Sequence, residues 1–115
     1  MNITIICVGK IKEKEGESIL RSIKENMFVI ALELKGDMIS SVELSNYIRD
    51  LGIKGDSNIA FVIGGSLGLS KAVLERSNFK LCFSKMTFPH QLFRVMLLEQ
   101  VYRGFRIISG EPYHK

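Results

Sequence analysis

The sequence has no tryptophan, only two prolines and two cysteines, and no long apolar run. Its longest apolar runs, FVIALEL and IAFVI, are far shorter than the roughly 20 residues that a membrane-spanning helix needs, so we expect no membrane partner. The start MNITIICVGK has neither a basic region before its apolar stretch nor a small-residue cleavage site, which is unlike a signal peptide. Cys7 and Cys82 lie inside apolar runs, and we expect buried, reduced thiols in a cytoplasmic protein. No cysteine–histidine cluster has zinc spacing, and we expect no metal.

The chain has 115 residues, enough for one domain with a modest core, which we place at residues 1–115. The formal net charge is +4, which favours an anionic binding partner. The last part of the sequence is the most basic, with only Glu99 and Glu111 against Arg94, Arg103, Arg106, His114 and Lys115. A merely solvated basic surface remains the alternative.

Short apolar runs alternate with stretches of helical periodicity. Strands are predicted at residues 3–8, 28–34, 58–63 and 80–84, and helices at 13–26, 40–51, 71–78 and from after Pro89 to about Phe105. Ser40 and Glu43 form a capping box, Ser70 caps the third helix, and Lys35-Gly36-Asp37 ends the second strand. Because the strands are continuously apolar, the pattern predicts an α/β fold: an open, mainly parallel sheet with helices on both faces.

The last predicted helix is apolar over most of its circumference. Its apolar residues are Leu92, Phe93, Val95, Met96, Leu97, Leu98, Val101, Tyr102 and Phe105. Such a helix must be buried on more than one side. A second copy of the chain would cover the side of the helix that the sheet does not cover, which predicts a homodimer. The alternative is a helix that is buried within the core of its own domain.

The segment IGGSLGLSKA follows the third strand and contains three glycines. It lacks the Lys-Ser or Lys-Thr pair of a phosphate-binding Walker loop, and its glycine spacing does not match the dinucleotide fingerprint. Two interpretations remain: a tight strand-to-helix turn, or a wall at which backbone comes close to a ligand. A second segment, FSKMTFPHQLFRV, also follows a strand, and its His90 either faces a pocket or helps cap the last helix.

These segments resemble the RlmH family, which are ribosomal RNA large-subunit pseudouridine N3-methyltransferases of the SPOUT superfamily. The similar stretches cover nearly the whole chain: ITIICVGK, EKEGESIL, FVIALELKG, FVIGGSLGLS, KLCFSKMTFPHQLFRVMLLEQVYRGFRI and GEPYHK. The resemblance implies a SPOUT-type fold with a C-terminal deep trefoil knot. It also implies an S-adenosyl-L-methionine-dependent enzyme that acts on large-subunit ribosomal RNA within the ribosome.

The resemblance assigns roles to particular positions. It implies that the cofactor is bound by Leu32, Gly64, Phe83, Ser84, Lys85, Met86, Thr87 and Phe88. It implies catalytic roles for His90, Arg103, Tyr113 and His114, and RNA binding by Arg94, Arg103, Tyr113 and His114. Either histidine is a candidate proton acceptor, Tyr113 a candidate for stacking on a base, and the arginines candidates for contacts with phosphate or base.

One departure from the family is large, because CVGKIK leads almost directly into EKEGESIL. The family's helix and strand after the first strand are missing. If the family's strand order is 5-3-4-1-2, the lost strand is at the edge, and the first strand becomes the new edge. A shortened, catalytically inactive domain that still binds cofactor or RNA is therefore the alternative function, and a generic nucleotide-binding module is a remote third.

Overall fold

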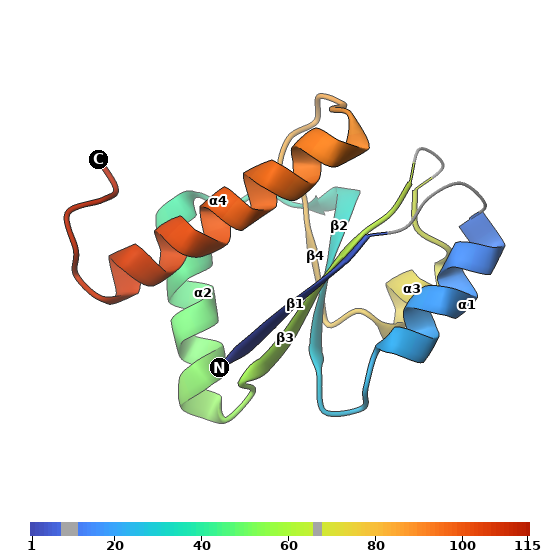
Figure 1. Ribbon diagram of the computed structural model, residues 1–115, viewed down its shortest axis with the longest axis horizontal. Coiled ribbons are helices and arrows are strands. Elements are labelled where there is room, and N and C mark those ends of the chain that lie inside the picture. The colour runs from blue at the N-terminus through green and yellow to red at the C-terminus, as the bar shows by residue number, and fades with distance from the viewer. Residues whose placement is uncertain (8–11, 66–67) are drawn as a thin grey trace.

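The structure is a computed structural model, and it describes residues 1–7, 12–65 and 68–115. Strands and helices alternate along the chain (Figure 1). Their bounds are β1 Asn2–Cys7, α1 Lys12–Ser22, β2 Phe28–Asp37, α2 Ser41–Lys54, β3 Asn58–Ile63, α3 Lys71–Arg76, β4 Phe79–Leu81 and α4 His90–Ile108. The four strands form one sheet in the order β1-β3-β2-β4, and every pair is parallel. The parallel sheet is confirmed, and β1 is an edge strand, as expected for a family member that lacks its second strand.

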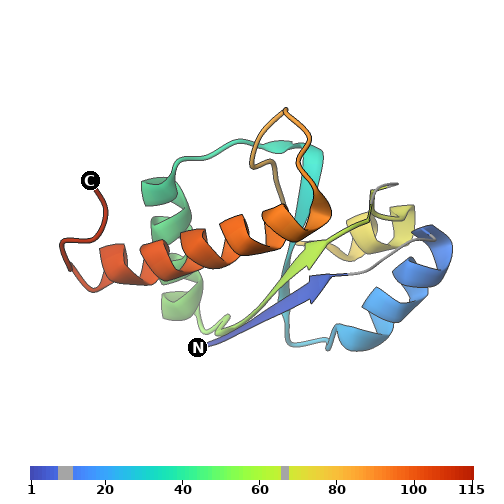
Figure 2. The same ribbon diagram turned by 45° about the horizontal axis from the view of Figure 1, so that its top comes forward.

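Helices cover both faces of the sheet, as predicted, with α2 and α4 on one side and α1 and α3 on the other (Figures 1 and 2). The core between the sheet and helices α2 and α4 contains Ile30, Leu44, Ile48, Leu51, Ile59, Phe61, Ile63, Leu81, Leu97 and Val101. The second core contains Ile19, Val29, Ala31, Ala60, Val62, Leu69 and Val73. Both faces of β2 and β3 are therefore buried, which explains why their sequences are continuously apolar.

Two predicted helix caps are present. The hydroxyl of Ser40 accepts a hydrogen bond from the backbone N–H of Glu43, and the Glu43 carboxylate accepts one from the backbone N–H of Ser40. Ser70 caps α3 by accepting from the backbone N–H of Val73. These bonds satisfy N–H groups that have no partner within their helix, and so they set where α2 and α3 begin.

The prediction that β2 ends before Lys35 is wrong. The strand continues through a bulge to Asp37, which pairs with Leu81 of β4 and accepts a hydrogen bond from the backbone N–H of Cys82 at 2.9 Å. Gly36 makes this crossing possible, since a Cβ there would lie 2.5 Å from the carbonyl oxygen of Lys80. The glycine thus marks a close approach of two strands rather than a turn.

Other predicted ends shift for local reasons. Helix α1 stops at Ser22 instead of continuing to residue 26, because the Arg76 side chain donates to the carbonyls of Lys24 and Met27 and holds a turn there. Helix α4 runs three residues past Phe105 and ends at Ile108, where Gly110 (φ 71°) donates its N–H back to the helix.

Strand β4 ends at Leu81 instead of residue 84, and Cys82 begins the turn towards α4. Cys82 is buried and Cys7 is half-buried, and both are free thiols. The prediction of a fully buried Cys7 is wrong because its strand is at the edge of the sheet. In the described part of the chain, no helix combines the length and apolar character needed to cross a bilayer.

Candidate active site

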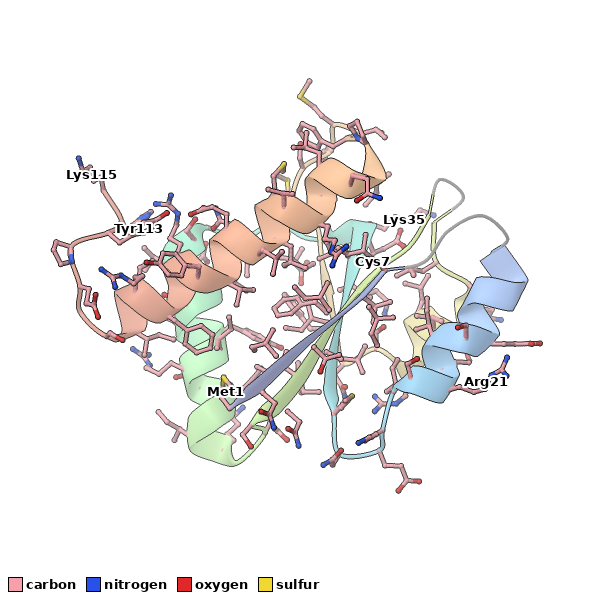
Figure 3. The ribbon with its side chains drawn as sticks, viewed as in Figure 1. Met1, Cys7, Arg21, Lys35, Tyr113 and Lys115 are labelled. Atoms are coloured by element: carbon pink, nitrogen blue, oxygen red, sulfur yellow. The ribbon has the colours of Figure 1, made fainter. Side chains whose placement is uncertain are left out.

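The carboxyl ends of β2, β3 and β4 border a cavity with a volume of about 690 Å³, which we call the larger cavity. Its lining comes from the end of β2, the glycine segment, and the turn between β4 and α4. Figure 3 labels Lys35, which lies in this wall, and Cys7, which ends the neighbouring part of the sheet. This is the position at which open parallel sheets bind ligands.

The described glycines of the segment form a tight turn, as one interpretation of the sequence expected, and they also line the cavity; the approach of a ligand to them remains a prediction. Gly68 has a positive φ of 79° and pairs with Gly65 in a short bridge. Gly64, Gly65 and Gly68 all line the cavity. A Cβ at Gly64 would lie 2.8 Å from the carbonyl carbon of Gly68, so the turn closes against Gly64 itself.

The turn between β4 and α4 supplies the facing wall. Of the positions assigned to the cofactor by the family resemblance, six line the cavity: Leu32, Gly64, Phe83, Ser84, Thr87 and Phe88. Phe93 of α4 packs between Phe83 and Phe88, with ring centroids 6.1 and 5.5 Å away. Lys85 and Met86 are exposed and do not line the cavity; the N–H of Met86 instead donates to the Ser84 hydroxyl at 3.0 Å. Cofactor binding by all eight positions remains a prediction.

His90 begins α4, directly after the N-cap residue Pro89, whose carbonyl accepts from the backbone N–H groups of Leu92 and Phe93. The His90 side chain lies outside the described part of the structure, so its role remains a prediction. Arg94 is exposed one turn further along α4. Burial raises the pKa of the Cys7 thiol, and the positive charge of Arg94 partly opposes this shift. Arg94 is therefore close to the end of β1.

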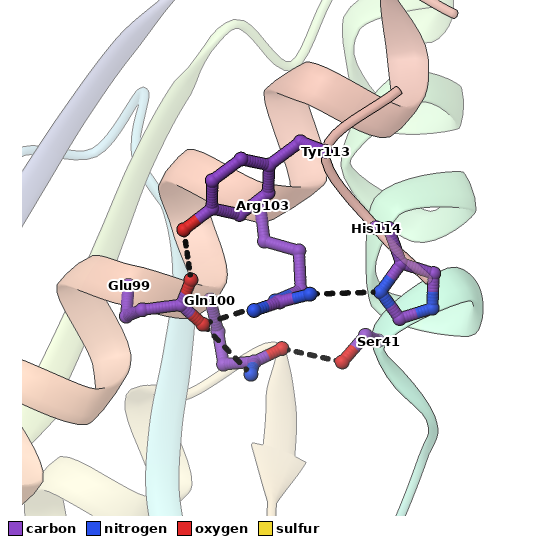
Figure 4. Close-up of polar contacts among 6 residues, drawn as sticks. All are labelled: Ser41, Glu99, Gln100, Arg103, Tyr113 and His114. Carbon is purple, nitrogen blue, oxygen red and sulfur yellow. Dashed lines mark hydrogen bonds and ion pairs between the residues drawn. The ribbon is translucent and has the colours of Figure 1, made fainter. Parts of the chain in front are cut away.

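The C-terminal tail folds back along α4, and four side chains join there (Figure 4). The Arg103 Nε donates to Glu99 at 3.0 Å, and the Tyr113 hydroxyl donates to the other oxygen of the same carboxylate at 3.0 Å. Arg103 Nη1 lies 3.0 Å from His114 Nδ1, and its guanidinium carbon lies 4.9 Å from the centre of the Tyr113 ring. Three predicted substrate-side residues therefore meet around Glu99, which the sequence interpretation did not single out.

Glu99 changes the pKa values of its partners in the tail network, which consists of Glu99, Arg103, Tyr113 and His114. The hydrogen bond from Arg103 is the largest effect and lowers the pKa of Glu99. Desolvation partly opposes it, and the hydrogen bond from the Tyr113 hydroxyl lowers the pKa by less than desolvation raises it. The hydrogen bond to Glu99 also raises the pKa of Tyr113 and of Arg103. The carboxylate is thus ionised at neutral pH, and the phenol and the guanidinium keep their protons.

A second, smaller cavity of about 330 Å³ lies between α2, α4 and the end of β4. Its wall shares Leu81, Cys82 and Phe83 with the larger cavity, and it extends to Glu99 and Gln100. The cavity therefore links the glycine segment to the tail network.

Three polar side chains at this cavity are joined in a chain of hydrogen bonds. Ser41 donates to the Gln100 carbonyl oxygen at 2.6 Å, and the Gln100 amide donates to Glu99 at 3.3 Å. The spacing of Glu99 four residues before Arg103 on a predicted helix is the sequence signal that could have found this group. Within residues 1–7, 12–65 and 68–115, no three histidine, cysteine, aspartate or glutamate side chains gather as a metal site would require.

Comparisons with known proteins agree with this geometry. A family model described as "Predicted SPOUT methyltransferase" matches residues 8–114. A protein of Clostridium tetani named ribosomal RNA large subunit methyltransferase H is 74% identical over 106 residues, which are 92% of this chain and 67% of the relative. Proteins of the same name from Clostridium acetobutylicum and Clostridium botulinum (strain Alaska E43 / Type E3) are 73% and 72% identical over 105 residues, 91% of this chain and 66% of each relative.

The chain thus spans about two thirds of the length of these relatives. The similarity includes both cavity walls and the tail residues up to His114. The model match over nearly the whole chain and the high identity lead to one conclusion: the chain belongs to the SPOUT methyltransferase family and, within it, to the RlmH family.

Proposed function

We propose that the chain is an S-adenosyl-L-methionine-dependent RNA methyltransferase that methylates N3 of a pseudouridine in large-subunit ribosomal RNA. The observation that carries this proposal is the larger cavity, which collects six of the eight expected cofactor positions at the carboxyl ends of three strands. The names of the relatives favour this function over the shortened, inactive domain.

The lining of the larger cavity fits S-adenosylmethionine better than a nucleoside phosphate. Its apolar side chains, among them Leu32, Leu69 and Phe88, suit an adenosyl group, and the glycine segment lets backbone approach it. Among the lining residues in the described part of the chain, Lys35 and Glu33 are the only ones with charged side chains. One cation and one anion match the carboxylate and the ammonium of an amino acid, whereas a triphosphate needs several donors.

The bound cofactor would supply a methyl group activated on a positively charged sulfur. The residues of the chain would then have to hold the base edge-on to the larger cavity and help N3 lose its proton. Positioning accounts for much of the rate in such a transfer. Arg103, held between Glu99 and His114, is suited to stabilise negative charge on the base, and His90 and His114 remain the candidate proton acceptors.

RNA binding would use the basic side of α4 and the tail. Arg94 is exposed, and Arg103 has N–H groups left after its bonds to Glu99 and His114. Tyr113 is held by its hydroxyl at the edge of the network and contacts Arg103 and Tyr102 with its ring, and an unstacked base would contact the 36% of the residue that is exposed. Recognition of an exposed base in a loop is the usual mode of sequence-specific RNA binding.

We also propose a homodimer and the family's trefoil knot, in a cytoplasmic protein. Leu92, Val95, Leu98 and Tyr102 follow one another at helical spacing on α4, and each is 43–60% exposed. A second copy would cover this stripe, while Leu97 and Val101 on the other side of the helix are buried against the sheet. The proposal of the knot depends on membership of the SPOUT family, whose model matches residues 8–114.

The test is methylation of large ribosomal subunits by the purified chain, with mass spectrometry of the target nucleotide. We expect one methyl group on N3 of a pseudouridine. Gly64→Val should abolish both the product and the binding of S-adenosylmethionine in titration calorimetry, because the added side chain collides with Gly68 and deforms the cavity wall. Unchanged cofactor binding in this variant would contradict the cavity assignment, and absence of product with the unaltered chain would contradict the activity.

A further inference from the structure

We propose that the smaller cavity binds the pyrimidine ring of the target nucleotide, and that Glu99 distinguishes pseudouridine from uridine by accepting the N1–H of the base. This inference rests on the proposed function, since it assigns a substrate site beside the cofactor cavity. It concerns Glu99 and Gln100, which neither the family resemblance nor the relatives' names assign to any role.

The shape of the cavity fits one base. Its volume of about 330 Å³ is at the lower end of the range for ligand pockets. Its walls combine apolar side chains, among them Ile39, Leu44, Phe83 and Met96, with the polar side chains of Ser40, Ser41, Glu99 and Gln100. Phe83, with Leu81 and Cys82, also lines the larger cavity, so a ring in the smaller cavity and a cofactor in the larger one would both contact these three residues.

Counted over the residues that the structure describes, the hydrogen bonds at the polar end of the cavity leave one acceptor position and one donor unused. A carboxylate offers about four acceptor positions, and Glu99 uses three of them, for Arg103, Gln100 and Tyr113. The Gln100 amide has two hydrogens, and in the described part of the chain one is donated, to Glu99. Figure 4 shows these two side chains next to each other at the centre of the network. Together they present an acceptor beside a donor.

This pair matches one edge of pseudouridine. Pseudouridine is joined to ribose through C5, so N1 carries a hydrogen, and C2=O lies beside it. The N1–H would donate to Glu99 and C2=O would accept from Gln100, which leaves N3 on the next position of the ring. In uridine the corresponding edge presents C5–H and C4=O. The carbonyl is retained, but the group that faces Glu99 is no longer a donor.

The network also explains how Glu99 can remain a good acceptor. Arg103 keeps the carboxylate ionised, since its hydrogen bond lowers the pKa of Glu99. The Glu99 side chain is 37% exposed, so a base that covers it would exchange water for the N1–H. A charged acceptor that loses water and gains no partner is unfavourable, and this is the physical basis for rejecting uridine.

The experiment compares binding of two fluorescent RNA hairpins that differ only in pseudouridine or uridine at one loop position. Measured by anisotropy, the unaltered chain should bind the pseudouridine hairpin about tenfold to a hundredfold more tightly, the range expected for one charge-assisted hydrogen bond. Glu99→Gln should reduce this preference to less than about threefold, because a neutral amide is a weaker acceptor.

Gln100→Leu is the matched control. The carbonyl that accepts from Gln100 is present in both bases, and Arg103 and Tyr113 still hold Glu99 after the bond from Gln100 is lost. This variant should therefore weaken both hairpins to the same extent and keep the preference. Thermal unfolding of both variants reports whether the chain is folded, and S-adenosylmethionine binding in each should equal that of the unaltered chain, because neither residue lines the larger cavity.

Two results would overturn the inference: no preference in the unaltered chain, or an equal preference in the unaltered chain and in Glu99→Gln. Failure of the proposed function gives a different result. If the preference is present and lost in Glu99→Gln, but the chain transfers no methyl group to the pseudouridine hairpin, the base site stands and the catalytic function does not.

Discussion

Gly36 is the position at which a single added methyl group should be most damaging. An alanine Cβ there would lie 2.5 Å from the carbonyl oxygen of Lys80, 2.6 Å from its carbonyl carbon and 2.9 Å from the nitrogen of Leu81. All three atoms belong to backbone, so no change of rotamer relieves the contact. Because ordinary contact begins at 3.4 Å, one strand would have to move by 0.9 Å relative to the other.

Such a movement has a calculable cost. Overpacking of this kind costs roughly 1–3 kcal/mol, and loss of the hydrogen bond from Cys82 N–H to Asp37 adds about 0.5–1.5 kcal/mol. We therefore expect Gly36→Ala to lower the free energy of unfolding by about 3 kcal/mol and Tm by about 10–15 °C. Domains of this size have about 5–15 kcal/mol of stability, so the variant should still fold at 20 °C.

The measurement is urea and thermal unfolding followed by circular dichroism. Gly104→Ala is the control, since its Cβ would lie 3.7 Å from Ser45, an ordinary contact, and alanine favours a helix by up to about 1 kcal/mol over glycine. Gly104→Ala should leave Tm unchanged or raise it. A Gly36→Ala variant within about 0.5 kcal/mol of the unaltered chain would refute the close crossing of β2 and β4.

Three further outcomes follow from the caps, the tail and α4. Ser40→Ala removes half of the capping box and should lower the free energy of unfolding, measured in urea, by about 1 kcal/mol. A decrease of less than about 0.3 kcal/mol would contradict a stabilising role of this cap. The lowered pKa of Glu99 stabilises the tail network above pH 4.5, the ordinary glutamate value, and this stability is lost as pH falls through the pKa of the folded state. The NMR signals of the Tyr113 ring should therefore shift when the pH falls below 4.5. Glu99→Gln should abolish this shift. Leu98→Glu should give a soluble monomer by light scattering. The control Ile53→Glu, at a 77% exposed position on α2, should keep the mass of the unaltered chain. Equal masses for the two variants would contradict a dimer formed through α4.

The layers of the fold were predictable because each buried strand had to be apolar on both faces. Runs such as IAFVI could not be half-exposed, and helices between them had to cover both faces of the sheet. The caps at Ser40 and Ser70 were predictable for another reason: their bonds involve residues only three positions apart. Local chemistry and burial thus account for most elements and their starts.

The ends of β2 and β4 were not predictable from local sequence. Lys35-Gly36-Asp37 has the composition of a turn, yet it is part of a strand because β4 crosses it at Gly36. The contact joins residues more than 40 positions apart, so no short window contains it. A glycine at a backbone crossing and a glycine in a turn look the same in the sequence.

The candidate site likewise contains some residues that the sequence could identify and others that it could not. The cofactor positions could be assigned because a characteristic family motif marks them, and six of the eight line one cavity. Glu99 and Gln100 lie in a stretch similar to the family, but the resemblance assigns them no role, and the helix was predicted to be apolar over most of its circumference. Their importance depends on the tail, which returns to α4 after Gly110 and brings Tyr113 and His114 to them.

This arrangement makes the tail and the smaller cavity dependent on each other. Arg103 and Tyr113 each donate to a different oxygen of Glu99, and together they hold its carboxylate in one orientation at the cavity end. Removing the Tyr113 hydroxyl would free one oxygen and let the carboxylate rotate towards its remaining donors, Arg103 and Gln100. The tail would then act on the base in two ways, through its own contacts and through the orientation of the acceptor on α4. A Tyr113→Phe variant, which keeps the ring and loses the hydroxyl, separates the two: it should reduce the preference for pseudouridine while leaving stacking on the base intact.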